Sequence, residues 1–109
     1  MPNHRYKVIT LCGSTKFKNE FLREQERLTL AGNVVMSVGV FGHVDDISMA
    51  DSTKIMLDDI HKQKIDMADE IFVINRHDYI GESTRNEINY AVICGKPIKY
   101  MEKHYEQNR

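Results

Sequence analysis

The sequence predicts a single α/β domain, in which a four-stranded parallel sheet lies between helices as a doubly wound, three-layer α/β/α sandwich. The 109 residues suit one domain with one core. Short, nearly continuous apolar runs alternate with amphipathic stretches of helical spacing, a pattern typical of parallel strands joined by right-handed crossover helices. We therefore expect the strand order 2-1-3-4, as in flavodoxin-like and Rossmann-like folds.

Seven segments make up the expected alternation. The strands are expected at residues 6–12, 33–38, 70–75 and 97–101, and the helices at residues 13–32, 52–68 and 83–95. Branched apolar residues dominate the first strand, which is typical of a strand buried on both faces. Gly32 and Gly95 each stand where a helix is expected to end. Residues 104–109 are interpreted as a tail.

The helix expected at residues 52–68 is amphipathic. Its apolar positions follow helical spacing and are expected to pack on the sheet: Met56, Leu57, Ile60, Met67 and Ala68. The polar positions between them are expected to face water: Asp58, Asp59, Lys62, Gln63 and Asp66.

Composition limits the partners and cofactors. The formal net charge is −1, from 15 basic and 16 acidic residues, and it favours neither a nucleic acid polymer nor an anionic membrane as a partner. Cys12 and Cys94 lack metal-ligand spacing, and His43, His61 and His77 are scattered, so no metal or other cofactor is expected. With no signal peptide or long apolar span, we expect a reduced, cytoplasmic protein.

The turn after the first strand is a candidate phosphate loop. Gly13, Ser14, Thr15 and Lys16 can offer backbone amides, hydroxyl groups and one cation, which together suit a phosphate monoester. The turn lacks the full P-loop or dinucleotide-binding fingerprint. In the alternative interpretation, Ser14 or Thr15 simply caps the helix that follows.

The stretch after the third strand is the strongest candidate for chemistry. Gly81 precedes Ser83 and Thr84, and a helix is expected to begin at one of these two hydroxyl residues. Glu87 would then lie about one turn into the helix, near its unpaired amides, and would project into a ligand cleft. Alternatively, Thr84 and Glu87 form a capping box, in which the two side chains bond reciprocally to the start of the helix.

The two candidate loops are expected to meet in one cleft. Ligands of doubly wound sheets bind at the carboxyl ends of the strands where the strand order reverses, here between the first and third strands. The substrate-binding residues expected in these loops are Gly13, Ser14, Thr15, Lys16, Asn75, Gly81, Ser83 and Thr84. The glycine-rich loop at residues 39–43 is expected to add a further wall.

Motifs spread over nearly the whole chain resemble the nucleoside 2-deoxyribosyltransferase superfamily, most closely its 2′-deoxynucleoside 5′-phosphate N-glycosidase branch. The matching residues are the phosphate-loop triplet Cys12-Gly13-Ser14, the pair Ala68-Asp69 before the third strand, and the helix motif Gly81, Glu87 and Ala91. The resemblance implies that Glu87 is a nucleophile that attacks the anomeric carbon, displaces the base and forms a glycosyl-enzyme intermediate. It also implies a homodimer or larger homo-oligomer whose subunits complete one another's active sites.

The chain departs from the family pattern near the site. Asn89 stands where the family commonly has glycine, and Glu82, Ser83 and Thr84 change the approach to the helix. The family's catalytic aspartate, about eight positions before the aspartate of the Ala-Asp pair, corresponds in register to His61.

The general acid therefore has three candidates. Asp58 or Asp59 could serve after a small shift of register, and His61 could serve because an ordinary histidine pKa suits proton transfer near neutrality. A half-buried packing role is the alternative for His61. Tyr79 could hold Glu87 or a sugar hydroxyl. Phe41 and His43 could lie against the base. For Tyr79 and Phe41 the alternative is ordinary packing.

The expected activity is cleavage or transfer at the N-glycosidic bond of a small-molecule nucleotide, a nucleoside 5′-monophosphate or a related compound. An oxocarbenium-like transition state requires a carboxylate on one face of the sugar and an acid near the departing base. A nucleoside monophosphate phosphoribohydrolase is the near alternative, because residues 81–87 loosely echo its signature. A nucleotide-binding sensor without turnover is the alternative of another class.

Overall fold

The computed structural model describes residues 5–42 and 48–104 and confirms the expected α/β architecture. All four strands are parallel, in the order β2-β1-β3-β4. The strands are β1 (Val8–Gly13), β2 (Val34–Met36), β3 (Glu70–Ile74) and β4 (Ile98–Tyr100). The helices are α1 (Lys18–Leu30), α2 (Asp51–Asp66) and α3 (Glu82–Ile93). Within these ranges no helix has the length and hydrophobicity needed to cross a bilayer.

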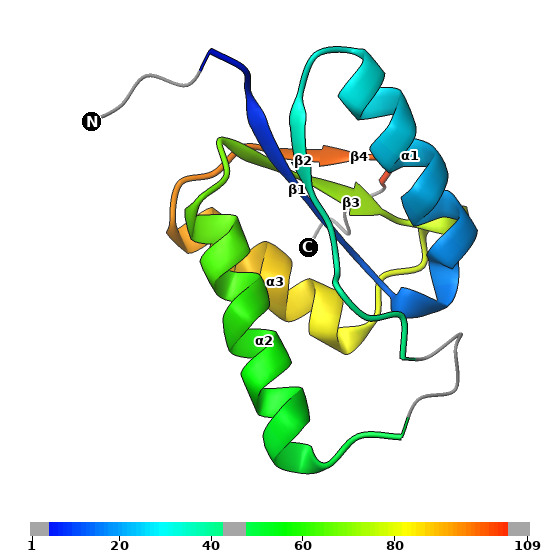
Figure 1. The fold of residues 1–109 in the computed structure, drawn as a ribbon, viewed down its shortest axis with the longest axis vertical. Coiled ribbons are helices and arrows are strands. Elements are labelled where there is room, and N and C mark those ends of the chain that lie inside the picture. Colours follow the sequence, from blue (N-terminus) through cyan, green and yellow to red (C-terminus); the bar gives the residue numbers. More distant parts are fainter. Residues whose placement is uncertain (1–4, 43–47, 105–109) are drawn as a thin grey trace, which may run out of the picture.

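The sheet is covered on both faces (Figure 1). Alternate residues of β1 point to opposite sides. Ile9 and Leu11 pack with Phe21 and other side chains of α1, whereas Cys12 packs with Ile65 of α2 and other residues on the opposite side. These two clusters are the core, and they place β1 and β3 at the centre of the layered fold.

The strand order reverses between β1 and β3, whose last residues Gly13 and Ile74 are paired in register. A Cβ at position 13 would lie 2.8 Å from the Ile74 carbonyl oxygen, so only glycine fits without a shift of the backbone. The close approach brings the loops that follow β1 and β3 together at one edge of the sheet.

The expectation for the buried face of α2 is only partly right, because Ala68 is buried and Leu57 is partly buried, but the other three positions are exposed. Met56, Ile60 and Met67 are about half exposed, and the buried residues of the helix are His61 and Ile65. The helix is rotated because its contacts to β1 come from other positions; for example, the Thr10 hydroxyl donates to the Lys64 carbonyl at 2.8 Å. His61 is thereby turned inward, toward the end of β1.

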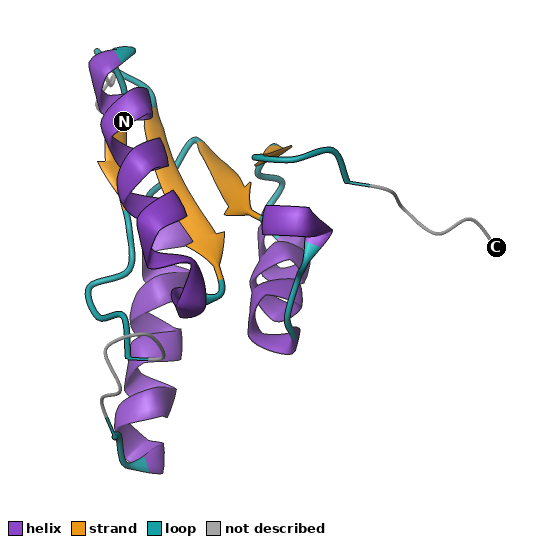
Figure 2. Cartoon of the chain, turned by 90° about the vertical axis from the view of Figure 1, so that its right-hand side faces the viewer, coloured by secondary structure: helices purple, strands orange, loops and turns teal. Residues whose placement is uncertain are grey.

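The N-terminal half of α2 extends beyond the ends of the strands, as Figure 1 and Figure 2 both show. Ile55 and Met56 in this half of the helix are more than a third exposed. Part of the apolar surface of α2 therefore has no cover among the described residues.

Candidate functional site

A cavity of about 610 Å³ opens at the carboxyl ends of β1 and β3. Its wall includes ten of the candidate residues named from the sequence: Gly13, Ser14, Thr15, Asp58, His61, Tyr79, Gly81, Ser83, Thr84 and Glu87. The cavity lies where the strand order reverses, so the two loops converge as expected.

Glu87 is a cavity residue and not a helix cap. The helix α3 begins at Glu82, with Gly81 as its N-cap and no capping hydrogen bond from a side chain. Thr84 is buried inside the first turn of α3 and does not precede it. The capping-box interpretation is therefore wrong, because Glu87 lies too far along the helix to bond back to the cap residue.

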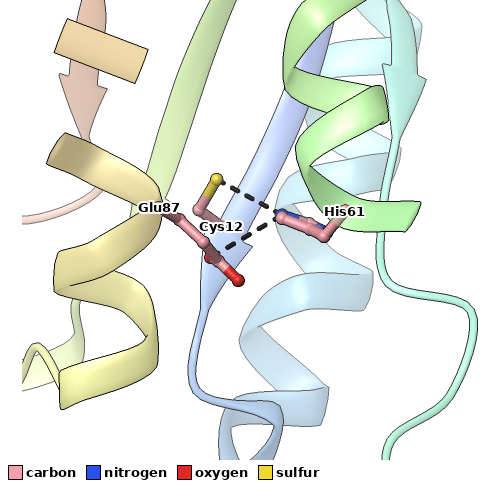
Figure 3. Close-up of side chains that lie close together, drawn as sticks. All are labelled: Cys12, His61 and Glu87. Atoms are coloured by element: carbon pink, nitrogen blue, oxygen red, sulfur yellow. Dashed lines mark hydrogen bonds and ion pairs between the residues drawn. The ribbon is translucent and has the colours of Figure 1, made fainter. Parts of the chain in front are cut away.

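Three side chains from three elements converge beside the cavity: Cys12 of β1, His61 of α2 and Glu87 of α3 (Figure 3). His61 Nε2 lies 3.4 Å from Cys12 Sγ and 3.7 Å from Glu87 Oε1. Cys12 is fully buried, and the side chains of His61 and Glu87 are 7% and 17% exposed. We call this group the Cys12–His61–Glu87 cluster.

Burial shifts the pKa of every group in the cluster. It raises the pKa of Glu87 to about 7, and the negative charge of Asp58 adds to this effect. Burial lowers the pKa of His61 to about 4, and the positive charge of Lys64 adds to it. Burial also raises the pKa of the Cys12 thiol, with Glu87 adding to the effect.

These shifts fix the protonation states near neutral pH. His61 is a neutral imidazole, Cys12 is a thiol, and Glu87 is close to half ionised. The expectation that His61 has an ordinary pKa is therefore wrong. An imidazole that is already neutral cannot supply the proton of an imidazolium, so His61 is not suited to be the general acid near neutral pH.

Asp58 is the aspartate of α2 that faces the cavity. It lines the wall, and its charge is felt by Glu87. Asp59 is exposed and is not part of the wall. Of the two neighbouring aspartates considered as general acids, only Asp58 lines the cavity.

The candidate phosphate loop caps a turn and lines the cavity. Ser14 caps a short 3-10 turn at Thr15–Phe17, because its hydroxyl accepts a hydrogen bond from the Lys16 amide at 3.3 Å. Ser14 and Thr15 also line the cavity. The α-helix itself begins only at Lys18, later than expected.

Lys16 is engaged with an aromatic ring and does not line the cavity wall. Its ammonium group lies 3.6 Å from the ring centroid of Tyr79, within the range of a cation–π contact. Phe17 packs edge-on against the same ring, with 5.9 Å between the centroids. These two contacts hold Tyr79 in the cavity wall.

Asn75 supports the turn that follows β3 through hydrogen bonds of its side chain. It is fully buried and outside the cavity wall, and its amide nitrogen donates to Asp78 Oδ1 at 2.9 Å and to the Glu102 carbonyl at 3.0 Å. His77 and Asp78 both have φ of 56°, a left-handed conformation that is uncommon for residues other than glycine. Asn75 therefore fixes the strained turn that leads to Tyr79.

Two further expectations concern the side chains proposed to contact the base. Phe41 packs edge-on against Phe21 of α1, at 5.5 Å between centroids, and does not line the cavity. This placement fits the packing alternative. His43 lies outside the described residues.

Cys12 was expected from the sequence in the phosphate-loop triplet, and its place beside His61 and Glu87 was not expected. The alternation of β1 was a usable signal, because it places Cys12 on the face of the sheet that α2 and α3 cover. The ligand atoms of Cys12, His61 and Glu87 all lie within 4.8 Å of one another. Sequence spacing does not reveal this group, because 49 and 26 residues separate its members along the chain.

A scan of protein-family models and a search of curated proteins found no match to this chain.

Proposed function

We propose that the chain cleaves, or transfers at, the N-glycosidic bond of a nucleoside 5′-monophosphate or a related nucleotide, with Glu87 as the nucleophile. The observation that carries the proposal is a partly buried carboxylate with a pKa of about 7 in the wall of a nucleotide-sized cavity. A glutamate tuned toward neutrality is typical of catalytic sites, and the sequence resemblance assigns the same residue.

In the first step, the ionised Glu87 attacks the anomeric carbon of the sugar. The carbon–oxygen bond of a glycosyl ester forms as the carbon–nitrogen bond to the base breaks, and the bonding pair leaves with the base. In the second step, a water molecule or a second base attacks the same carbon and releases the carboxylate. The departing base takes up one proton from solvent in the first step, and an attacking water molecule returns one proton in the second step, so the protons balance.

Asp58 is assigned to the departing base. It is the aspartate of α2 in the cavity wall, and glycoside cleavage requires a second carboxyl group near the leaving group. His61 is assigned a positioning role, because its neutral ring lies 3.7 Å from the Glu87 carboxylate. Tyr79 lines the cavity and is assigned to the sugar or to the approach of Glu87.

The loop at Gly13, Ser14 and Thr15 is assigned to the 5′-phosphate. It lies in the same wall as Glu87 and carries two hydroxyl side chains at a turn. Lys54 of α2 also lines the cavity and adds a positive charge to it. Together these groups suit an anionic ligand more than a neutral nucleoside.

A homodimer or larger homo-oligomer is part of the proposal. Four apolar side chains on α2 and its C-cap residue are at least 42% exposed: Ile55, Met56, Ile60 and Met67. Ile60 also lines the cavity, so a second subunit that covered this face would add to the wall around the substrate.

The test is incubation of the protein with a panel of ribo- and 2′-deoxyribonucleoside 5′-monophosphates, followed by chromatographic measurement of free base. Release of base from deoxyribonucleotides supports the proposal. Release confined to ribonucleotides would instead favour a phosphoribohydrolase. Tight binding without release from any compound would favour the sensor and contradict catalysis.

A further inference from the structure

The Cys12–His61–Glu87 cluster has the donor atoms and spacing of a metal site. Tetrahedral zinc, with bonds of about 2.0 to 2.3 Å, places its ligand atoms about 3.3 to 3.6 Å apart. The observed separations are 3.4 Å from Cys12 Sγ to His61 Nε2 and 3.7 Å from His61 Nε2 to Glu87 Oε1. Shifts of a few tenths of an ångström would bring these two pairs to the tetrahedral distances.

We propose that Cys12, His61 and Glu87 bind a divalent transition-metal ion of the zinc class, with a fourth coordination position open to the cavity. The sulfur ligand selects against magnesium and calcium, which prefer oxygen ligands. Three protein ligands with one open position is the arrangement of accessible zinc sites. His61 and Glu87 line the cavity, which gives the ion a path of entry.

The three elements that carry the ligands are held in place independently of an ion. Thr10 bonds to the Lys64 carbonyl and ties α2 to β1. Tyr90 of α3 donates to Asp66 of α2 at 2.6 Å and ties those two helices together. A site whose ligands are already positioned binds an ion without the cost of ordering the chain.

Binding of the metal ion is accompanied by release of protons. The ion coordinates the sulfur as a thiolate, so the Cys12 proton leaves to solvent, and Glu87 binds as a carboxylate. His61 binds through the lone pair of its neutral ring. No oxidation or reduction takes place.

Occupancy would also block base release, because an oxygen of Glu87 would be bonded to the ion and unable to attack a sugar. This consequence rests on the proposed function, whereas the metal site itself does not. The two ideas can therefore fail separately.

The test uses Co²⁺ as a spectroscopic probe on the full chain after treatment with chelator. We expect one equivalent of Co²⁺ to bind, with a thiolate-to-cobalt charge-transfer band in the near ultraviolet and the visible absorption of four-coordinate cobalt. Zn²⁺ should displace the cobalt and remove both features. The measurement does not depend on catalytic activity.

The two cysteines provide a matched pair of variants. Cys94 is exposed at the end of α3, so Cys94→Ser should retain the charge-transfer band, and Cys12→Ser should lose it. His61→Gln should weaken Co²⁺ binding by at least about tenfold. Circular dichroism establishes that each variant is folded. If Cys12→Ser does not fold, His61→Gln and Glu87→Gln carry the test.

Absence of a charge-transfer band in the parent protein would overturn the proposal. Loss of the band in Cys94→Ser with retention in Cys12→Ser would also overturn it, because the exposed thiol would then be the ligand. Undiminished Co²⁺ affinity in both His61→Gln and Glu87→Gln would do the same.

Discussion

Replacing Glu87 by glutamine should stabilise the folded protein at alkaline pH and do so much less at acidic pH. Glutamine is neutral and nearly isosteric with the protonated acid. The folded-state pKa of Glu87 is about 7, against an ordinary value of 4.5. The difference corresponds to about 3 kcal/mol of unfavourable free energy for ionising the carboxyl in the folded chain.

The sign follows from which state binds the proton more tightly. Because the folded-state pKa of Glu87 is raised, its stabilising contribution is fully present below about 4.5 and is lost as the pH rises through about 7. At about pH 8 the stability of the wild type is reduced by the full free energy of ionising Glu87 in the folded chain, whereas the stability of Glu87→Gln is not. At about pH 5 most of the difference has disappeared, and about 2 to 3 kcal/mol should separate the two conditions.

The pH dependence of the wild-type free energy of unfolding would not reveal this effect by itself. The folded-state pKa of His61 is lowered to about 4, so its contribution is present above its ordinary value of 6.5 and is lost as the pH falls through about 4. Between these values the two groups act in opposite directions and nearly cancel. Subtracting the wild type from Glu87→Gln removes the contribution of His61.

The assay is urea unfolding of both proteins at about pH 5 and about pH 8, in buffer with chelator so that the protein is metal-free. Any pH-independent effect of the amide cancels between the two conditions. Glu82→Gln makes the same chemical change at an exposed position of the same helix and provides the baseline. An equal difference between Glu87→Gln and wild type at both pH values would refute the raised pKa of Glu87.

Three further predictions concern activity, binding and assembly. Base release should rise with pH through about 7 as Glu87 ionises. Asp58→Asn should lower the rate, because Asp58 is assigned to the departing base, and should move the rising limb of the pH–rate profile to lower pH, because it removes a negative charge that raises the pKa of Glu87. A rising limb at the wild-type pH would contradict this coupling. Ser14→Ala should weaken binding of a nucleotide at least about tenfold more than binding of its nucleoside, because it removes one hydrogen bond to phosphate; equal losses, with about 1 kcal/mol less stability, would indicate a cap alone. Light scattering should show a dimer or larger assembly that Ile60→Glu weakens, and a monomer that is fully active at micromolar concentration would contradict the expected assembly.

The strand order and the meeting of the two loops could be predicted from the sequence, because both follow from local patterns. Continuous apolar runs in β1 and β3 indicate burial on both faces, and parallel strands place their carboxyl ends at one edge of the sheet. Glycine at these two loops was a local signal as well. Gly13 allows the close approach of β1 to the Ile74 carbonyl, and Gly81 is the N-cap of α3.

The start of α3 was mispredicted because the helix has no polar cap. Sequence rules look for a hydroxyl side chain at the N-cap, and Ser83 and Thr84 provided that signal. The chain instead enters the helix at Gly81, and Thr84 is buried within the first turn. A capping box was therefore the wrong interpretation of Glu87, which instead lines the cavity.

The environment of His61 depends on tertiary contacts that have no local signature. The rotation of α2 is set by contacts such as that of Thr10 with the Lys64 carbonyl, 54 residues apart. This rotation buries His61, lowers its pKa and brings its ring to Cys12 and Glu87. A sequence-based assignment of an ordinary pKa could not include any of these effects.

The most direct test of the central claim is the rate of base release from a 2′-deoxynucleoside 5′-monophosphate by metal-free Glu87→Gln, measured beside its affinity for the same nucleotide. A neutral amide is a poor nucleophile and cannot stabilise the developing positive charge on the sugar. We predict that release falls by at least about a thousandfold, while the nucleotide still binds and the variant remains folded. A folded Glu87→Gln protein that releases base at the parent rate would contradict the assignment of Glu87 as the nucleophile.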